Sequence, residues 1–130
     1  MGNARGCFES FKVRLGEEIM TTIFAKIIRG ELPADKVFEN ERILAIKDIN
    51  PAAPVHLLII SKKEITDLQS AKPEDLPLIA EMIKVAQELA KEYGVADGYR
   101  LLTNNGLNAG QMIFHLHFHL LGGKKLGPIG

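Results

Sequence analysis

Apolar residues at a spacing of three and four predict two helices. Thr21 or Thr22 supplies an N-cap for the first helix, and Gly30 suits its end. The second helix runs from Asp75 to Tyr93, where an apolar stripe recurs at helical spacing. Pro77 restricts the start of this helix, since proline is tolerated only in the first turn. Each helix therefore has one apolar face to bury.

Shorter apolar runs predict five strands, bounded by residues that favour turns. The expected strands are Lys36–Glu39, Ile43–Lys47, Val55–Ile60, Tyr99–Asn104 and Gln111–Leu121. The first two form a hairpin, and a turn rich in asparagine and glycine joins the last two. Because strands and helices do not alternate regularly, the pattern predicts an α+β domain. Its core is a five-stranded, mostly antiparallel sheet with two main helices.

Length and composition fit one soluble domain. The chain has 130 residues, of which 46% are hydrophobic, and this is sufficient for a single core. We expect residues 1–20 to form a mobile N-terminal extension and residues 21–130 to form the domain.

Charge and cysteine usage narrow the possible partners. Sixteen basic and sixteen acidic residues cancel, so we expect neither nucleic acid nor a membrane surface as a partner. The single cysteine, Cys7, cannot form an internal disulfide, which favours a cytoplasmic setting. An anionic ligand would need a local site.

The segment QMIFHLHFHLLGG carries the main chemical signal. His115, His117 and His119 alternate with apolar residues, and such alternation predicts a strand with all three imidazoles on one face. Alternate side chains would lie roughly 6 to 7 Å apart along the backbone. The fourth histidine, His56, would by itself be read as structural. Three adjacent imidazoles, however, are a costly way to build a core.

Two chemistries use such a row of histidines. Neutral imidazoles can bind a metal such as zinc, with water in the open position. Alternatively, one imidazole attacks phosphorus while its neighbours hold the phosphoryl oxygens and supply a proton. Asn105, Gly106, Asn108 and Gly110 permit a tight turn that can direct amides at an anion. This turn favours the phosphoryl chemistry, and the metal remains the alternative.

GQMIFHLHFHLLGG resembles the His-x-His-x-His-x-x signature of the histidine triad (HIT) family, in particular its nucleotide-binding, Hint-like branch. TTIFAKIIRGELPADKVFEN, ILAIKDINPAAPVHLLIISKK and NNGLNAGQ resemble the same branch, so the likeness extends from Thr21 to Gly123.

The resemblance implies a homodimeric hydrolase of purine nucleoside phosphoramidates that needs no cofactor or metal. It would cleave the P–N bond and release AMP or GMP through a nucleotidyl-histidine, and would also act on aminoacyl adenylates. By analogy His117 is the nucleophile and His119 contacts the scissile phosphate. His115 and His56 would belong to the network that orients the site.

The resemblance also implies a nucleoside pocket. Asp48 matches the residue that binds the ribose hydroxyls, since a carboxylate is a suitable double acceptor. The apolar wall around the base would consist of Ile23, Phe24, Ile27, Ile46 and Ile49, and the residues beside the phosphate would be Asn104, Gly110 and Met112. From the residues alone, the isoleucines are core positions and Asp48 is a turn residue.

The chain departs from the family pattern at several places. Met112 stands where this branch usually has a serine, so a hydroxyl donor is missing, and Ile46 replaces a frequent aromatic residue. The chain has no tryptophan, whereas some relatives place one near the partner's site. These departures leave a nucleotide-binding or scaffold protein with little catalysis as a second alternative.

Overall fold

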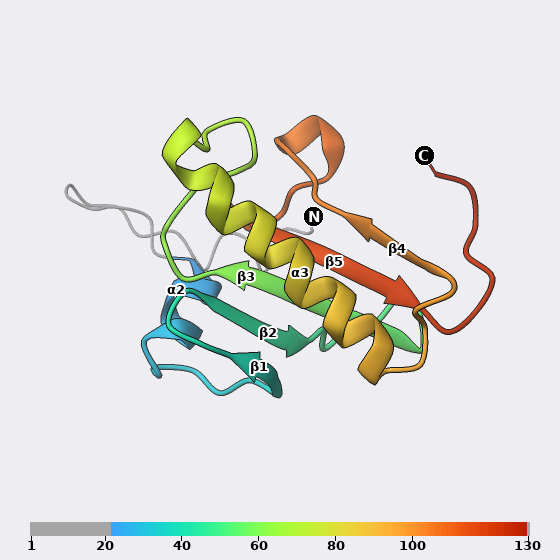
Figure 1. Cartoon of the computed structure of the whole chain (residues 1–130). Coiled ribbons are helices and arrows are strands. Elements are labelled where there is room, and N and C mark those ends of the chain that lie inside the picture. The colour runs from blue at the N-terminus through green and yellow to red at the C-terminus, as the bar shows by residue number, and fades with distance from the viewer. Residues whose placement is uncertain (1–21, 130) are drawn as a thin grey trace.

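A sheet of five antiparallel strands forms the centre of the molecule (Figure 1). The computed structural model describes residues 22–129, so the expected extension 1–20 lies outside the described residues. The strands are β1 (Lys36–Glu39), β2 (Ile43–Lys47), β3 (Val55–Ser61), β4 (Tyr99–Leu102) and β5 (His117–Gly122). Their order is β1-β2-β3-β5-β4, and every neighbouring pair is antiparallel. The predicted α+β class is confirmed.

A helix covers each face of the sheet. Helix α3 (Leu76–Glu92) crosses one face (Figure 1), where Met82 and Leu89 are buried in the larger of the two apolar clusters. Helix α2 (Ile23–Ile28) contributes Phe24 and Ile27 to the second cluster, which includes alternate residues of β2 and β3. The central strands β2 and β3 are therefore buried on both sides.

The strand period determines which side chains reach the α2 face. In β3, Leu57 and Ile59 belong to the α3 cluster, whereas Leu58 and Ile60 belong to the α2 cluster, which explains the nearly continuous apolar run of this strand. In β5, Leu120 belongs to the α3 cluster. The imidazoles that alternate with it therefore project on the face that α2 covers.

The helix boundaries lie close to the predicted ones. Thr22 is the N-cap of α2, and its hydroxyl accepts a hydrogen bond from Ala25 N at 3.1 Å. Helix α3 follows a short 3₁₀ turn, Pro73–Asp75, and ends at Glu92 before Gly94. Within residues 22–129, no helix is both long and apolar enough to cross a membrane.

Four strand boundaries differ from the prediction, and two of them, the ends of β3 and β5, differ by only one residue. Strand β4 ends at Leu102 rather than Asn104, and β5 begins at His117 rather than Gln111, so the expectation that His115 lies in the strand is wrong. The cause is the side chain of Gln111, which is only 3% exposed. Its amide nitrogen donates to Thr66 O and Ile113 O, which holds this segment in a bend instead of on the ladder.

Candidate active site

His117 lies at the start of β5 with one ring nitrogen fixed by the backbone. Its Nδ1 is 2.6 Å from the carbonyl oxygen of His115. A carbonyl can only accept, so Nδ1 carries the hydrogen and Nε2 retains a lone pair. The ring of Phe24 packs edge-on against the imidazole, with the centroids 4.9 Å apart. His117 therefore presents an oriented, unprotonated nitrogen.

His115 is buried and holds the neighbouring elements together. Its Nε2 donates to Ser61 O at 2.6 Å, so its Nδ1 is the acceptor for the Thr22 hydroxyl at 3.4 Å. This imidazole thereby links the end of β3 to the start of α2. Although His115 lies outside β5, its ring remains near Phe24, 6.1 Å away between centroids.

His56 and His119 form a directed pair. Ala52 N donates to His56 Nδ1 at 3.0 Å, so the hydrogen of His56 is on Nε2. His56 Nε2 lies 2.9 Å from His119 Nδ1, which must accept that hydrogen. The hydrogen of His119 is consequently on Nε2. His119 thus offers a donor beside the lone pair of His117, with the two ring centroids 5.1 Å apart.

Burial keeps the four histidines neutral. Loss of solvent is the main cause that lowers the pKa of His56, His115 and His117. The pKa of His119 is lowered to about 3, mainly by burial and in addition by repulsion from His117 and His56. The Asp48 charge acts in the opposite direction on His56 and His117. A neutral row avoids the repulsion that charged neighbours would suffer.

A pocket of about 280 Å³ opens beside His117 and His119. It brings together seven of the residues that the sequence assigned to the site: Phe24, Asp48, Asn104, Gly110, Met112, His117 and His119. Four further residues complete the wall and were not predicted: Asn50, Leu58, Gln111 and Ile113. Leu58 and Ile113 look like ordinary core positions in the sequence, so no local signal marks them.

The remaining predicted residues lie around this pocket rather than in its wall. His56 contacts the site through its hydrogen bond to His119, and His115 does so through its carbonyl oxygen, which accepts from His117 Nδ1. Ile27 and Ile46 are buried in the α2 cluster, against which Ile23 packs. Ile49 is 89% exposed. A role for these isoleucines in holding a base stays a prediction.

The glycine-rich turn uses its amides internally. The amides of Ala109 and Gln111 donate to Gly106 O, and that of Gly110 donates to Leu107 O. Gly106 N is bound to the Gln111 side chain. These four amides are therefore engaged within the turn, and the expectation that the turn directs amides at an anion stays a prediction for its other residues. Gly110 needs its φ of +96° to close the turn.

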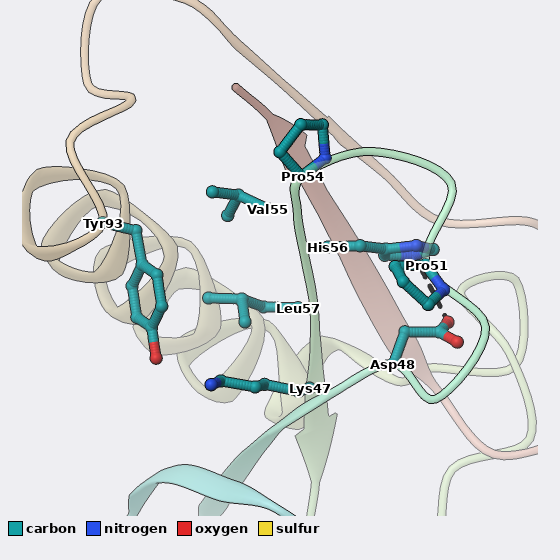
Figure 2. A pocket seen from close by; sticks show the side chains of 8 residues that line it. All are labelled: Lys47, Asp48, Pro51, Pro54, Val55, His56, Leu57 and Tyr93. Atoms are coloured by element: carbon teal, nitrogen blue, oxygen red, sulfur yellow. Dashed lines mark ion pairs between the residues drawn. The ribbon is translucent and has the colours of Figure 1, made fainter. Parts of the chain in front are cut away.

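A smaller hollow of about 170 Å³ lies at the end of the sheet (Figure 2). Leu57 and Val55 point toward Tyr93, which follows the last residue of α3, while His56 points toward Asp48 (Figure 2). Asp48 lines both this hollow and the larger pocket. The Asp48–His56 pair thus lies between the two hollows.

Asp48, His56 and His119 place three potential metal-ligating atoms within 4.8 Å of one another. A ligating histidine normally donates a hydrogen bond from its other ring nitrogen. In His56, Nδ1 accepts from Ala52 N instead, so Nε2 carries a hydrogen and has no lone pair for a metal. These three residues therefore suit hydrogen bonding better than metal binding.

Comparisons of sequence and of structure with known proteins all match HIT or histidine triad proteins. A sequence model of the HIT domain matches residues 29–126. A HIT-like protein of Chlamydia pneumoniae is 56% identical over 108 residues, covering 83% of this chain and 98% of that protein. A solved HIT family hydrolase from Clostridium thermocellum is 47% identical, with a TM-score of 0.81 over 86% of this chain and 98% of that one. A hypothetical histidine triad nucleotide-binding protein from Sulfolobus tokodaii is 41% identical, with a TM-score of 0.68 over 75% of this chain and 66% of that one.

Proposed function

Because the chain belongs to the HIT domain family, we propose that it is a hydrolase of purine nucleoside phosphoramidates. It cleaves the P–N bond and releases AMP or GMP, and aminoacyl adenylates are further substrates. The observation that carries the proposal is the bond from His117 Nδ1 to His115 O, which leaves the Nε2 lone pair free for attack. The names of the hydrolase and the nucleotide-binding relative support the same class.

The first step forms a bond between His117 Nε2 and phosphorus while the P–N bond breaks. The leaving nitrogen takes the hydrogen of His119 Nε2 and departs as an amine, and the negative charge left on His119 is offset by the positive charge of the imidazolium that forms at His117. In the second step water attacks phosphorus, the bond to His117 breaks, and a proton of the water returns to His119. His119 can serve in both steps because His56 fixes its tautomer.

The nucleotide occupies the pocket of about 280 Å³. Asp48 accepts hydrogen bonds from the ribose hydroxyls, and Asn104 and Gly110 lie beside the phosphate. Phe24 and Leu58, both buried, form the apolar part of the wall. The amides of Met112 and Ile113 make no hydrogen bond within residues 22–129, so they are the available donors for a phosphoryl oxygen.

The proposal includes a homodimer. Strand β4 forms one edge of the sheet, and its outer side pairs with no strand among residues 22–129. A second copy that pairs there would remove the exposed edge. Sedimentation equilibrium of the purified protein distinguishes a monomer from a dimer.

The test is incubation of the protein with a labelled adenosine phosphoramidate. We expect AMP as product and transient adenylation of the peptide that contains His117, detected by mass spectrometry. His117→Ala should lower kcat more than about a thousandfold and abolish the adduct. Phe118→Leu, which changes the adjacent residue on the α3 face, is the folding control. Undiminished turnover in His117→Ala would refute the assigned nucleophile, and tight AMP binding without cleavage would favour the scaffold alternative.

A further inference from the structure

Asp48, which the proposed function assigns to the ribose hydroxyls, also contacts two groups of the protein itself, Asn50 N and His56 Nε2. We infer that its carboxylate is also a positioning group for the chemical step, because it holds His56 in the orientation that makes His119 a donor at Nε2. This inference rests on the proposed function for its kinetic consequence. It assigns one carboxylate to both substrate recognition and catalysis.

The two oxygens of Asp48 have different partners. Oδ1 accepts a hydrogen bond from Asn50 N at 2.8 Å, which fixes the loop after β2. Oδ2 lies 3.3 Å from His56 Nε2, as the dashed line in Figure 2 shows. The His56 side chain is 7% exposed and that of Asp48 is 19% exposed, so solvent screens this contact only partly. One oxygen therefore serves the loop and the other serves the histidine.

The loop from Asp48 to His56 is closed by further bonds. Asp48 N donates to His56 O at 3.0 Å, and Ala52 N donates to His56 Nδ1 at 3.0 Å. A flip of the imidazole would break the Ala52 bond and move Nε2 away from the carboxylate. The position of the ring is therefore determined from both of its nitrogens.

The negative charge of Asp48 favours a hydrogen on the nearer nitrogen of His56. A carboxylate only accepts, so it stabilises the Nε2–H form over a form with a lone pair at Nε2. His56 Nε2 is the group that donates to His119 Nδ1 at 2.9 Å. Through His56, Asp48 thus favours the tautomer of His119 whose Nε2 hydrogen is donated to the leaving group.

The charge also acts directly across the site. Asp48 opposes the lowering of the pKa of both His56 and His117. It lines the same pocket as His117 and His119. A ribose would therefore bind the same carboxylate that orients His56 and, through it, His119.

A substrate without ribose hydroxyls separates the two roles. We would compare adenosine phosphoramidate with its 2′,3′-dideoxy form, using the wild-type protein and Asp48→Asn. The asparagine retains an oxygen for Asn50 N, so the loop should keep its conformation. With the ribose substrate, Asp48→Asn should raise KM and lower kcat. With the dideoxy substrate, we expect kcat to fall at least about tenfold while KM is unchanged. An unchanged kcat on the dideoxy substrate would overturn the inference.

Two variants test the route of the effect. If Asp48 acts through His56, then Asp48→Asn should lower kcat on the dideoxy substrate no further in a His56→Asn background. If Asp48→Asn lowers kcat in the His56→Asn background as much as it does in the wild type, Asp48 does not act through His56. Asp35→Asn is the matched control, because Asp35 is an exposed carboxylate 3.8 Å from Lys47 Nζ and lies outside the pocket. It should leave kcat unchanged on both substrates.

A readout independent of turnover completes the test. The ¹⁵N chemical shifts of the ring nitrogens report which nitrogen carries the hydrogen. We expect His119 to be protonated at Nε2 in the wild type. In Asp48→Asn only the Ala52 amide still favours this tautomer of His56, so the share of the Nδ1-protonated forms of His56 and His119 should rise. Identical ring shifts in the two proteins would refute the inference. If the wild type cleaves neither substrate, the proposed function fails, and these shifts still decide the role of Asp48.

Discussion

At the scale of single residues, Met112 is the side chain most directly open to test. It lines the pocket and is 41% exposed, and the family resemblance places a serine at this position. We expect Met112→Ser to raise kcat on an adenosine phosphoramidate several-fold, about 1 kcal/mol of transition-state stabilisation, because a hydroxyl adds a donor. Met112→Ala is the control, since it removes the thioether without adding a donor. Equal rates for the serine and alanine variants would contradict this role of the hydroxyl.

At the scale of elements, the loop between β4 and β5 depends on one buried amide. The Gln111 side chain accepts from Gly106 N at 2.7 Å and donates to two carbonyls. Gln111→Met has a similar size and no hydrogen-bonding groups, so Gly106 N, Thr66 O and Ile113 O each lose a partly buried hydrogen bond. We expect the free energy of unfolding to fall by about 2–3 kcal/mol, measured by urea denaturation, and nucleotide affinity to fall with it. Gln87→Met, at an exposed position of α3, should change neither quantity. Equal stabilities of the two variants would show that the loop does not need this amide.

At the scale of the whole molecule, the buried histidines make stability depend on pH. A histidine with a folded pKa below its unfolded value of about 6.5 stabilises the protein above that pH, and the contribution is lost as pH falls. For His119, whose pKa is about 3, the loss extends from about pH 6.5 down to about 3. We expect the free energy of unfolding at pH 5.5 to be at least about 1 kcal/mol lower than at pH 7.5. His119→Gln should reduce this difference. Equal urea midpoints at both pH values would contradict the expected linkage.

Much of the fold could be predicted from the sequence because its signals are local. The bounds of β1 and β2 agree with the prediction, and Thr22 caps α2 as its hydroxyl suggests. Alternation also placed His117 and His119 on one face of β5. In each case neighbouring residues suffice, since strand period and helix capping are properties of short segments.

The parts that could not be predicted depend on contacts between distant segments. His115 leaves the strand because Gln111 bonds to Thr66, which is far away in the chain. The tautomer of His119 depends on His56 and on the amide of Ala52, and no residue near His119 in the sequence indicates it. The sequence therefore predicted the reactive groups, but their protonation pattern required the folded arrangement.

The shared use of the Thr22 hydroxyl limits how this position can vary. The same oxygen accepts from Ala25 N to begin α2 and contacts His115 Nδ1. Aspartate and asparagine cap helices as well as threonine does, but a carboxylate has no hydrogen to donate to the imidazole, and in asparagine the acceptor and the donor are two different atoms. Serine alone preserves both bonds with similar geometry. A position that would tolerate several capping residues in an ordinary helix is thus reduced to the two hydroxyl residues, and the triad determines which substitutions the start of α2 can accept.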